Sequence, residues 1–310
     1  MYRLILLLLI FITVPIRAIE PIRPLPQQLS DITLEKAKLG RTLFLDTILS
    51  SDQTVSCSSC HSFEHGGADP RDVSLGVNGR PGIMQSPTVY NSRYNFKQFW
   101  NGRASNLHEQ TSGPLMAHVE MNMSPETIEM RINQSDYYRE AFAALYGEGK
   151  VTFNNIVDAI VEFEKALVTP NSRFDRYLRG ELTLTKDEQM GYAKFKSLGC
   201  VTCHNGINVG ANTFQKMGLI REYPYDPKYL DRYAVTKKEY HKNVYKVPTL
   251  RNITLTAPYF HNAKAKDLDD AIYTMGYYNL GIKISRQDIT LLHKFLETLE
   301  GERPAILDMP

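Results

Sequence analysis

The sequence lacks a surplus of charge of either sign, a long alternation of apolar and polar residues, and an apolar run of transmembrane length. Its 36 Lys and Arg side chains are balanced by 34 Asp and Glu side chains over 310 residues. Nothing in this near-neutral balance suggests a nucleic-acid partner. Without alternating patterns a sheet-based fold is disfavoured, and the periodic segments that remain are helical.

Cysteine is scarce as well, and the four cysteines of the chain fall in two copies of the motif C-x-x-C-H. This motif is typical of c-type haem attachment. Its two thiols form thioether bonds with the porphyrin, and its histidine is the proximal ligand of the iron. The copies consist of Cys57, Cys60 and His61, and of Cys200, Cys203 and His204. They predict two covalently bound haems and redox chemistry carried by these cofactors.

Paired cysteines have three other common uses: a thioredoxin-like redox pair, a structural disulfide and a zinc site. A lone C-x-x-C would leave all three open, but here both pairs are followed by histidine in a chain with only eight histidines. A four-cysteine zinc site needs its pairs much closer than the 140 positions from Cys60 to Cys200. Haem attachment is therefore the favoured interpretation.

Residues 1–18 have the pattern of a secretory signal peptide. Arg3 precedes an apolar run from Leu4 to Val14, and the small residue Ala18 marks the expected cleavage position. The run is too short for a comfortable transmembrane helix, although an uncleaved anchor is the alternative. Because bacteria attach haem covalently outside the cytoplasm, the signal and the motifs both predict the periplasm.

The two motifs divide the mature chain into an N-terminal haem domain at 19–170 and a C-terminal haem domain at 171–310. Helical patterns occur at 34–45, 153–167, 185–195 and 285–299, the last two opening with caps at Thr185 and Ser285. The segment 169–172 (Thr-Pro-Asn-Ser) is the expected hinge. These features predict a mostly α fold with two cytochrome c-like domains and long loops over the haems.

Several segments around the motifs resemble the bacterial di-haem cytochrome c peroxidases from about residue 30 to 301. The segments are SPTVYN at 86–91, QFWNGR at 98–103, VEM at 119–121, TPNS at 169–172, KVPTLRN at 246–252 and LTAPYFH at 255–261. The wider family includes di-haem enzymes that mature methylamine dehydrogenase by oxidising a protein. The resemblance implies a peroxidase that reduces hydrogen peroxide with electrons from a small cytochrome c or cupredoxin.

The resemblance assigns different roles to the two haems. It implies that the second haem is the electron-entry haem, with Met275 opposite His204. Thioether ligation raises the potential of a haem, which suits an acceptor of electrons. The protein-oxidising relatives carry Tyr at this position, so Met275 favours the peroxidase branch.

At the first haem the resemblance implies a peroxide site with Glu120 as general acid–base. A carboxylate above an open haem face can move a proton between the two peroxide oxygens. Gln110 matches a residue of the same pocket, and Trp100, the single tryptophan, matches the aromatic residue between the haems.

One position departs from the pattern of many of these peroxidases. They close the first haem with a histidine sixteen residues after the proximal histidine, where this chain has Val77. Valine cannot bind iron, so the first haem is expected to be five-coordinate or water-bound and active without reductive activation. His65 and His118 are the two side chains that could replace the missing ligand.

The family also places a calcium ion between the domains. Thr256 and Pro258 match its backbone ligands, and Gln85 stands where an Asn amide is usual. His261 matches a position beside the electron-entry haem. A homodimer is common in the family and stays an open expectation here.

Two other functions remain as alternatives to the peroxidase. A di-haem enzyme that oxidises a protein substrate also fits the absent distal histidine. A non-enzymatic di-haem electron carrier fits the two motifs but leaves Glu120 and the open first haem without a use.

Overall fold

The computed structural model describes residues 20–310, so the expected signal peptide lies outside the described part of the chain. Ten α-helices and one two-stranded sheet form this part, and the predicted mostly α fold is confirmed. Within residues 20–310 no helix is both long and apolar enough to cross a membrane.

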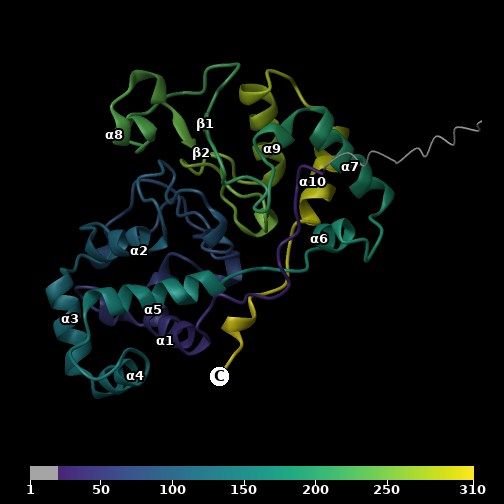
Figure 1. Cartoon of the computed structure of the whole chain (residues 1–310). Helices are drawn as coiled ribbons and strands as arrows, with labels where there is room; N and C mark the ends of the chain where they lie inside the picture. Colours follow the sequence, from purple (N-terminus) through teal and green to yellow (C-terminus); the bar gives the residue numbers. More distant parts are fainter. Residues whose placement is uncertain (1–19) are drawn as a thin grey trace, which may run out of the picture.

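Five helices belong to the N-terminal half (Figure 1). They are α1 (Leu34–Leu45), α2 (Leu107–Met116), α3 (Pro125–Gln134), α4 (Asp136–Tyr146) and α5 (Phe153–Ala166). Their apolar faces meet in one buried cluster that includes Phe44, Ile160 and Phe163. The helices predicted at 34–45 and 153–167 correspond to α1 and α5.

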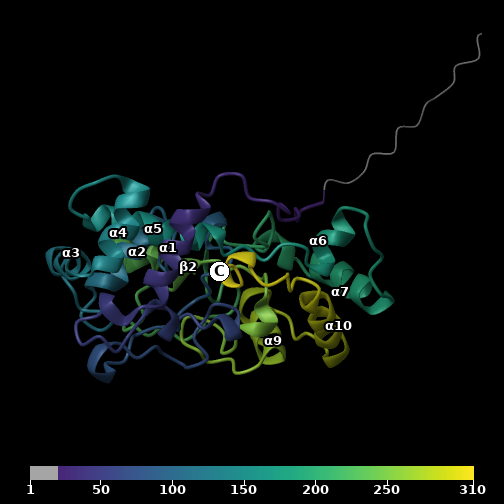
Figure 2. The ribbon, with the colours of Figure 1, turned by 90° about the horizontal axis from the view of Figure 1, so that it is seen from below.

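The other five helices belong to the C-terminal half, which Figure 2 shows beside the first. They are α6 (Arg173–Leu178), α7 (Lys186–Ser197), α8 (Arg232–Thr236), α9 (Leu268–Asn279) and α10 (Arg286–Glu297). The antiparallel strands β1 (Phe214–Lys216) and β2 (Val244–Lys246) lie between α7 and α9 in the chain. The expected caps form, since Thr185 accepts a hydrogen bond from the Glu188 amide and Ser285 from the Asp288 amide.

Each half contains the same close crossing of two helices. A Cβ on Gly40 of α1 would lie 1.9 Å from the carbonyl oxygen of Ala159 on α5. A Cβ on Gly191 of α7 would lie 2.0 Å from the carbonyl oxygen of Leu291 on α10. Only glycine permits this close approach of the two backbones. In both halves the haem motif follows shortly after the helix that carries this glycine.

The ends of the described chain pack on opposite halves. Ile22 lies in the C-terminal cluster, whereas Ile306 lies in the N-terminal cluster. Arg41 of α1 holds the C-terminal segment by donating to the carbonyl oxygen of Ile306 at 2.8 Å. In Figure 1 the purple and yellow segments accordingly run between the two halves.

The segment 169–172 connects α5 to α6 between the two clusters, but it is not an exposed linker. Thr169 and Ser172 are buried, and the Thr169 hydroxyl accepts hydrogen bonds from the amides of Asn91 and Asn252, each at 2.8 Å. The expected hinge is therefore a hydrogen-bonded connection inside the molecule.

Candidate functional site

Both C-x-x-C-H motifs adopt the same short helical turn. In the first, the amide of His61 donates to the carbonyl oxygen of Cys57 at 3.0 Å, and in the second His204 donates to Cys200 at 3.0 Å. The turn brings both thiols and the imidazole of a motif to one side of the chain. All four cysteines are free of disulfide bonds.

The two motifs open into one cavity of about 640 Å³ between the halves. Its wall is mostly apolar, with Phe44, Leu115 and Leu292 among the lining residues. Most of the site residues predicted from the sequence also line this cavity. They are Gln85, Trp100, Gln110, Glu120, Thr256, Pro258, His261 and Met275.

The residues around the motifs fit haem. Burial raises the pKa of the Cys200 thiol to about 11 and holds the pKa of the Cys57 thiol above its usual range, so both thiols stay protonated near neutral pH. Burial also lowers the pKa of His204 to about 4, which keeps its ring neutral for iron. His61 Nδ1 lies 3.2 Å from the carbonyl oxygen of Gly67, which leaves its Nε2 for the metal.

Glu120 lines the cavity beside one positive side chain. Burial raises its pKa, and the nearby Arg103 guanidinium opposes that rise. Arg103 itself stacks over the Phe99 ring at 3.4 Å from the ring centre. The Glu120 carboxyl group thus lies in a partly desolvated environment, in which it can both accept and release a proton.

Val77 and the two candidate replacement histidines do not line the cavity. Val77 is fully buried behind Glu120, and its amide donates to the Glu120 carbonyl oxygen at 2.8 Å. His65 lies near the Ser62 hydroxyl at 3.3 Å, and His118 near the Asn122 amide oxygen at 3.2 Å. Both histidines are therefore held at other contacts, away from the cavity wall.

Trp100 occupies a loop at the boundary of the two halves. Its indole Nε1 donates to the carbonyl oxygen of Gln85 at 2.8 Å. Its ring meets the rings of Tyr245 and His261 edge to face, at 6.5 and 6.3 Å between centres. Met275, on α9, lies against the small cluster to which Tyr245 belongs.

The three expected calcium ligands lie on the same cavity wall. Gln85 is buried, and its side-chain nitrogen donates to the carbonyl oxygen of Asp69 at 3.4 Å, which leaves the amide oxygen available. Thr256 directly precedes the Ala257–Pro258 peptide bond, which is cis. No group of three or more His, Cys, Asp or Glu side chains within residues 20–310 forms a metal site of its own.

Four charged residues of the cavity wall are not among the site residues predicted from the sequence: Arg103, Glu164, Lys216 and Lys246. Glu164 is buried on α5, where burial raises its pKa to about 8 and the Thr111 hydroxyl is its hydrogen-bond partner at 3.3 Å. A signal existed for Glu164, because it follows Ile160 by four residues on the apolar face of the helix. Lys246 stands in a strand of three residues, where no periodicity could reveal burial.

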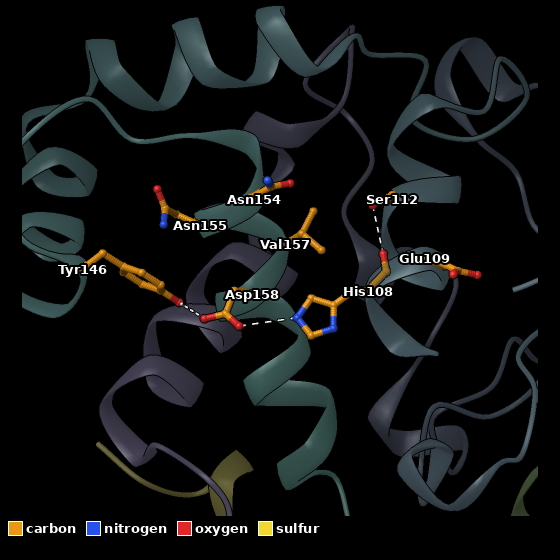
Figure 3. A pocket seen from close by; sticks show the side chains of 8 residues that line it. All are labelled: His108, Glu109, Ser112, Tyr146, Asn154, Asn155, Val157 and Asp158. Atoms are coloured by element: carbon orange, nitrogen blue, oxygen red, sulfur yellow. Dashed lines mark hydrogen bonds and ion pairs between the residues drawn. The ribbon is translucent and has the colours of Figure 1, made fainter. Parts of the chain in front are cut away.

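A second hollow lies on the surface of the N-terminal half (Figure 3). His108 points to Asp158 at 3.4 Å, and the Tyr146 hydroxyl donates to the same carboxylate at 2.8 Å. Ser112 donates to the backbone oxygen of His108 and not to its ring. The hollow therefore lacks a serine activated by a base.

Comparison with known proteins gives the same family as the motifs. Residues 34–183 match the family described as di-haem cytochrome c peroxidase. The cytochrome c551 peroxidase of Nitrosomonas europaea is 42% identical over 286 residues, which cover 92% of this chain and 85% of that protein. The cytochrome c peroxidase Ccp of Escherichia coli is 40% identical over 294 residues, which cover 93% of this chain and 63% of that protein.

Solved structures agree with the fold. A MauG-like protein associated with microbial copper homeostasis matches with a TM-score of 0.79 at 29% identity, over 94% of this chain and 95% of that chain. Together with two haem-attachment motifs on one cavity, these similarities show that the chain belongs to the di-haem cytochrome c peroxidase family and is an enzyme of that class.

Proposed function

We propose that this chain is a periplasmic peroxidase that reduces hydrogen peroxide at its first haem without prior reductive activation. The observation that carries the proposal is the composition of the cavity wall beside the first motif. Glu120 is part of this wall, whereas Val77, His65 and His118 are not. The part of the cavity beside Glu120 would therefore leave room for peroxide at the first haem.

Bound haem iron supplies the redox chemistry of peroxide reduction, and the protein supplies the proton transfer. Glu120 accepts a proton from one peroxide oxygen and returns it to the other, which leaves as water. Arg103 favours the ionised form of Glu120 that starts this transfer. Gln110, on the same wall, orients the peroxide through its amide.

His204 and Met275 would hold the second haem, through which electrons would enter. Methionine ligation would give this haem a potential high enough to take electrons from a small cytochrome c or cupredoxin. Trp100 lies between the halves and belongs to the wall of the same cavity as both motifs. It therefore serves as the contact between the electron-entry haem and the peroxide site.

Calcium, compartment and assembly complete the proposal. The amide oxygen of Gln85 and the backbone oxygens of Thr256 and Pro258 would hold a calcium ion, which would stabilise the boundary near Trp100. The signal peptide at 1–18 and the covalent haems support the periplasm. A homodimer is a further expectation from the family.

Steady-state turnover separates the proposal from its two alternatives. The all-ferric protein is mixed with peroxide and a reduced small cytochrome c, and oxidation of the cytochrome is followed. A peroxidase without an activation step turns over at once, an electron carrier does not turn over, and a protein-oxidising enzyme turns over little. Turnover that begins only after pre-reduction would refute the absence of reductive activation.

A further inference from the structure

Lys246 is a buried cation without an anionic partner. The residue is 6% exposed, and its backbone amide donates to the carbonyl oxygen of Trp100 at 2.7 Å. Its side chain lines the cavity between the halves. Among the described residues no hydrogen bond or ion pair reaches its ammonium group, and burial lowers its pKa to about 8.

A buried ammonium group without a partner is strongly unfavourable, so such groups are normally paired with an anion or used in covalent chemistry. Covalent chemistry by lysine needs a substrate with a reactive carbonyl group, and a haem does not provide one. An anion that is present in the working protein is therefore the better explanation for Lys246.

The carboxylates of the cavity wall do not supply that anion. Glu120 is next to Arg103, and Glu164 is hydrogen-bonded to Thr111. Neither carboxylate influences the pKa of Lys246. The partner of Lys246 must come from the molecules that occupy the cavity, and these are the two haems. Each haem carries two propionate carboxylates, which match an ammonium group in charge and in hydrogen bonding.

We propose that Lys246 binds a haem propionate at the boundary of the two halves. This ion pair fixes the position of β2 relative to the haem. The hydrogen bond from the Lys246 amide to the Trp100 carbonyl oxygen then fixes the loop that carries Trp100. Lys246 is then a positioning residue: it acts on the placement of Trp100 and on the charge beside one haem. This inference rests on haem binding and not on the proposed peroxide reaction.

Redox titration of both haems in Lys246→Met tests the pairing. Loss of the cation leaves a propionate charge uncompensated, which favours ferric over ferrous iron. We expect the reduction equilibrium of one haem to become at least tenfold less favourable, a shift of about 59 mV for one electron. Lys246→Arg should keep most of the potential, and Lys238→Met, on an exposed lysine, should leave both potentials unchanged.

Unchanged potentials of both haems in Lys246→Met would overturn the proposal. If that variant does not acquire its haems, the crystal structure of the wild-type holoenzyme decides: a propionate oxygen within about 4 Å of Lys246 Nζ supports the pairing, and a longer distance overturns it. Peroxide turnover of the wild type is measured separately. Its absence would refute the proposed function and leave the pairing unaffected.

Discussion

The amide of Val77 donates to the carbonyl oxygen of Glu120 at 2.8 Å, so the loop at the position expected of a distal histidine supports Glu120, the proposed general acid–base. The neighbouring Gly76 packs even more closely against the backbone of Val119 and Glu120. A Cβ on Gly76 would lie 2.1 Å from the Val119 carbonyl oxygen and 2.6 Å from that of Glu120. The backbone around Glu120 is thus positioned by the loop at Gly76 and Val77, of which Gly76 lines the cavity and Val77 does not.

Replacing Gly76 tests this support. Gly76→Ala forces the Glu120 backbone to move, and a displacement of about 1 Å at a catalytic group lowers rates by about 100-fold. We expect peroxide turnover to fall to this extent while the haem content, measured as the pyridine haemochrome, stays at two per chain. Gly82→Ala is the matched control, because its Cβ would meet the Ser74 carbonyl oxygen at an ordinary 3.4 Å. Equal turnover in both variants would contradict the supporting role.

Glu120→Gln tests the proton transfer itself. The amide keeps the size of the side chain but cannot accept and return a proton, so turnover should fall by about 10²–10⁴-fold. Visible spectra of both haems should stay unchanged. Glu140→Gln, on an exposed glutamate of α4, should retain full turnover. A Glu120→Gln protein with wild-type turnover would exclude Glu120 from the mechanism.

The buried Glu164 predicts a pH-dependent stability. Its pKa is raised from 4.5 to about 8 by burial, so between these values the folded state binds a proton that the unfolded state has lost. The free energy of unfolding must therefore decrease as the pH rises through this window, and the contribution is fully present only below the lower value. Urea titrations at several pH values should show this slope.

The Glu164→Gln variant should lose that slope, because its amide does not titrate. An exposed substitution, Glu148→Gln, should keep it. Identical pH dependence in wild type and Glu164→Gln would mean that Glu164 is ionised in the folded protein.

A buried ion pair ties the N-terminal segment to the C-terminal half. Arg251 Nη2 lies 2.9 Å from Asp175 Oδ1, both side chains are fully buried, and Arg251 also donates to the carbonyl oxygen of Arg23. Arg251→Met leaves Asp175 buried without its partner, so the free energy of unfolding should fall by about 3–5 kcal/mol. Lys266→Met, which breaks an exposed pair with Asp72, should cost about 1 kcal/mol or less. Similar losses in the two variants, measured by urea unfolding, would contradict the account.

Sequence patterns predicted the parts of this fold that depend on neighbouring residues. The helices at 34–45 and after Thr185 and Ser285 follow from local periodicity and from caps within one helical turn. Each haem motif is likewise defined by five consecutive residues. These signals suffice for a mostly α chain with two haem sites.

Other features depend on contacts between distant segments, which local patterns do not contain. Ile306 packs in the N-terminal cluster although it follows the second haem motif by about a hundred residues. Lys246 is buried because β2 pairs with β1 and with the Trp100 loop, and Glu164 is buried because α5 packs on α1 and α2. Such placements become visible only in the assembled fold.

The electron paramagnetic resonance spectrum of the all-ferric protein tests the central claim most directly. An open first haem beside Glu120 predicts a high-spin ferric signal from the first haem together with a low-spin signal from the second, recorded before any reductant is added. A spectrum with only low-spin haem would show that another side chain closes the first haem, and it would contradict a peroxidase that needs no reductive activation.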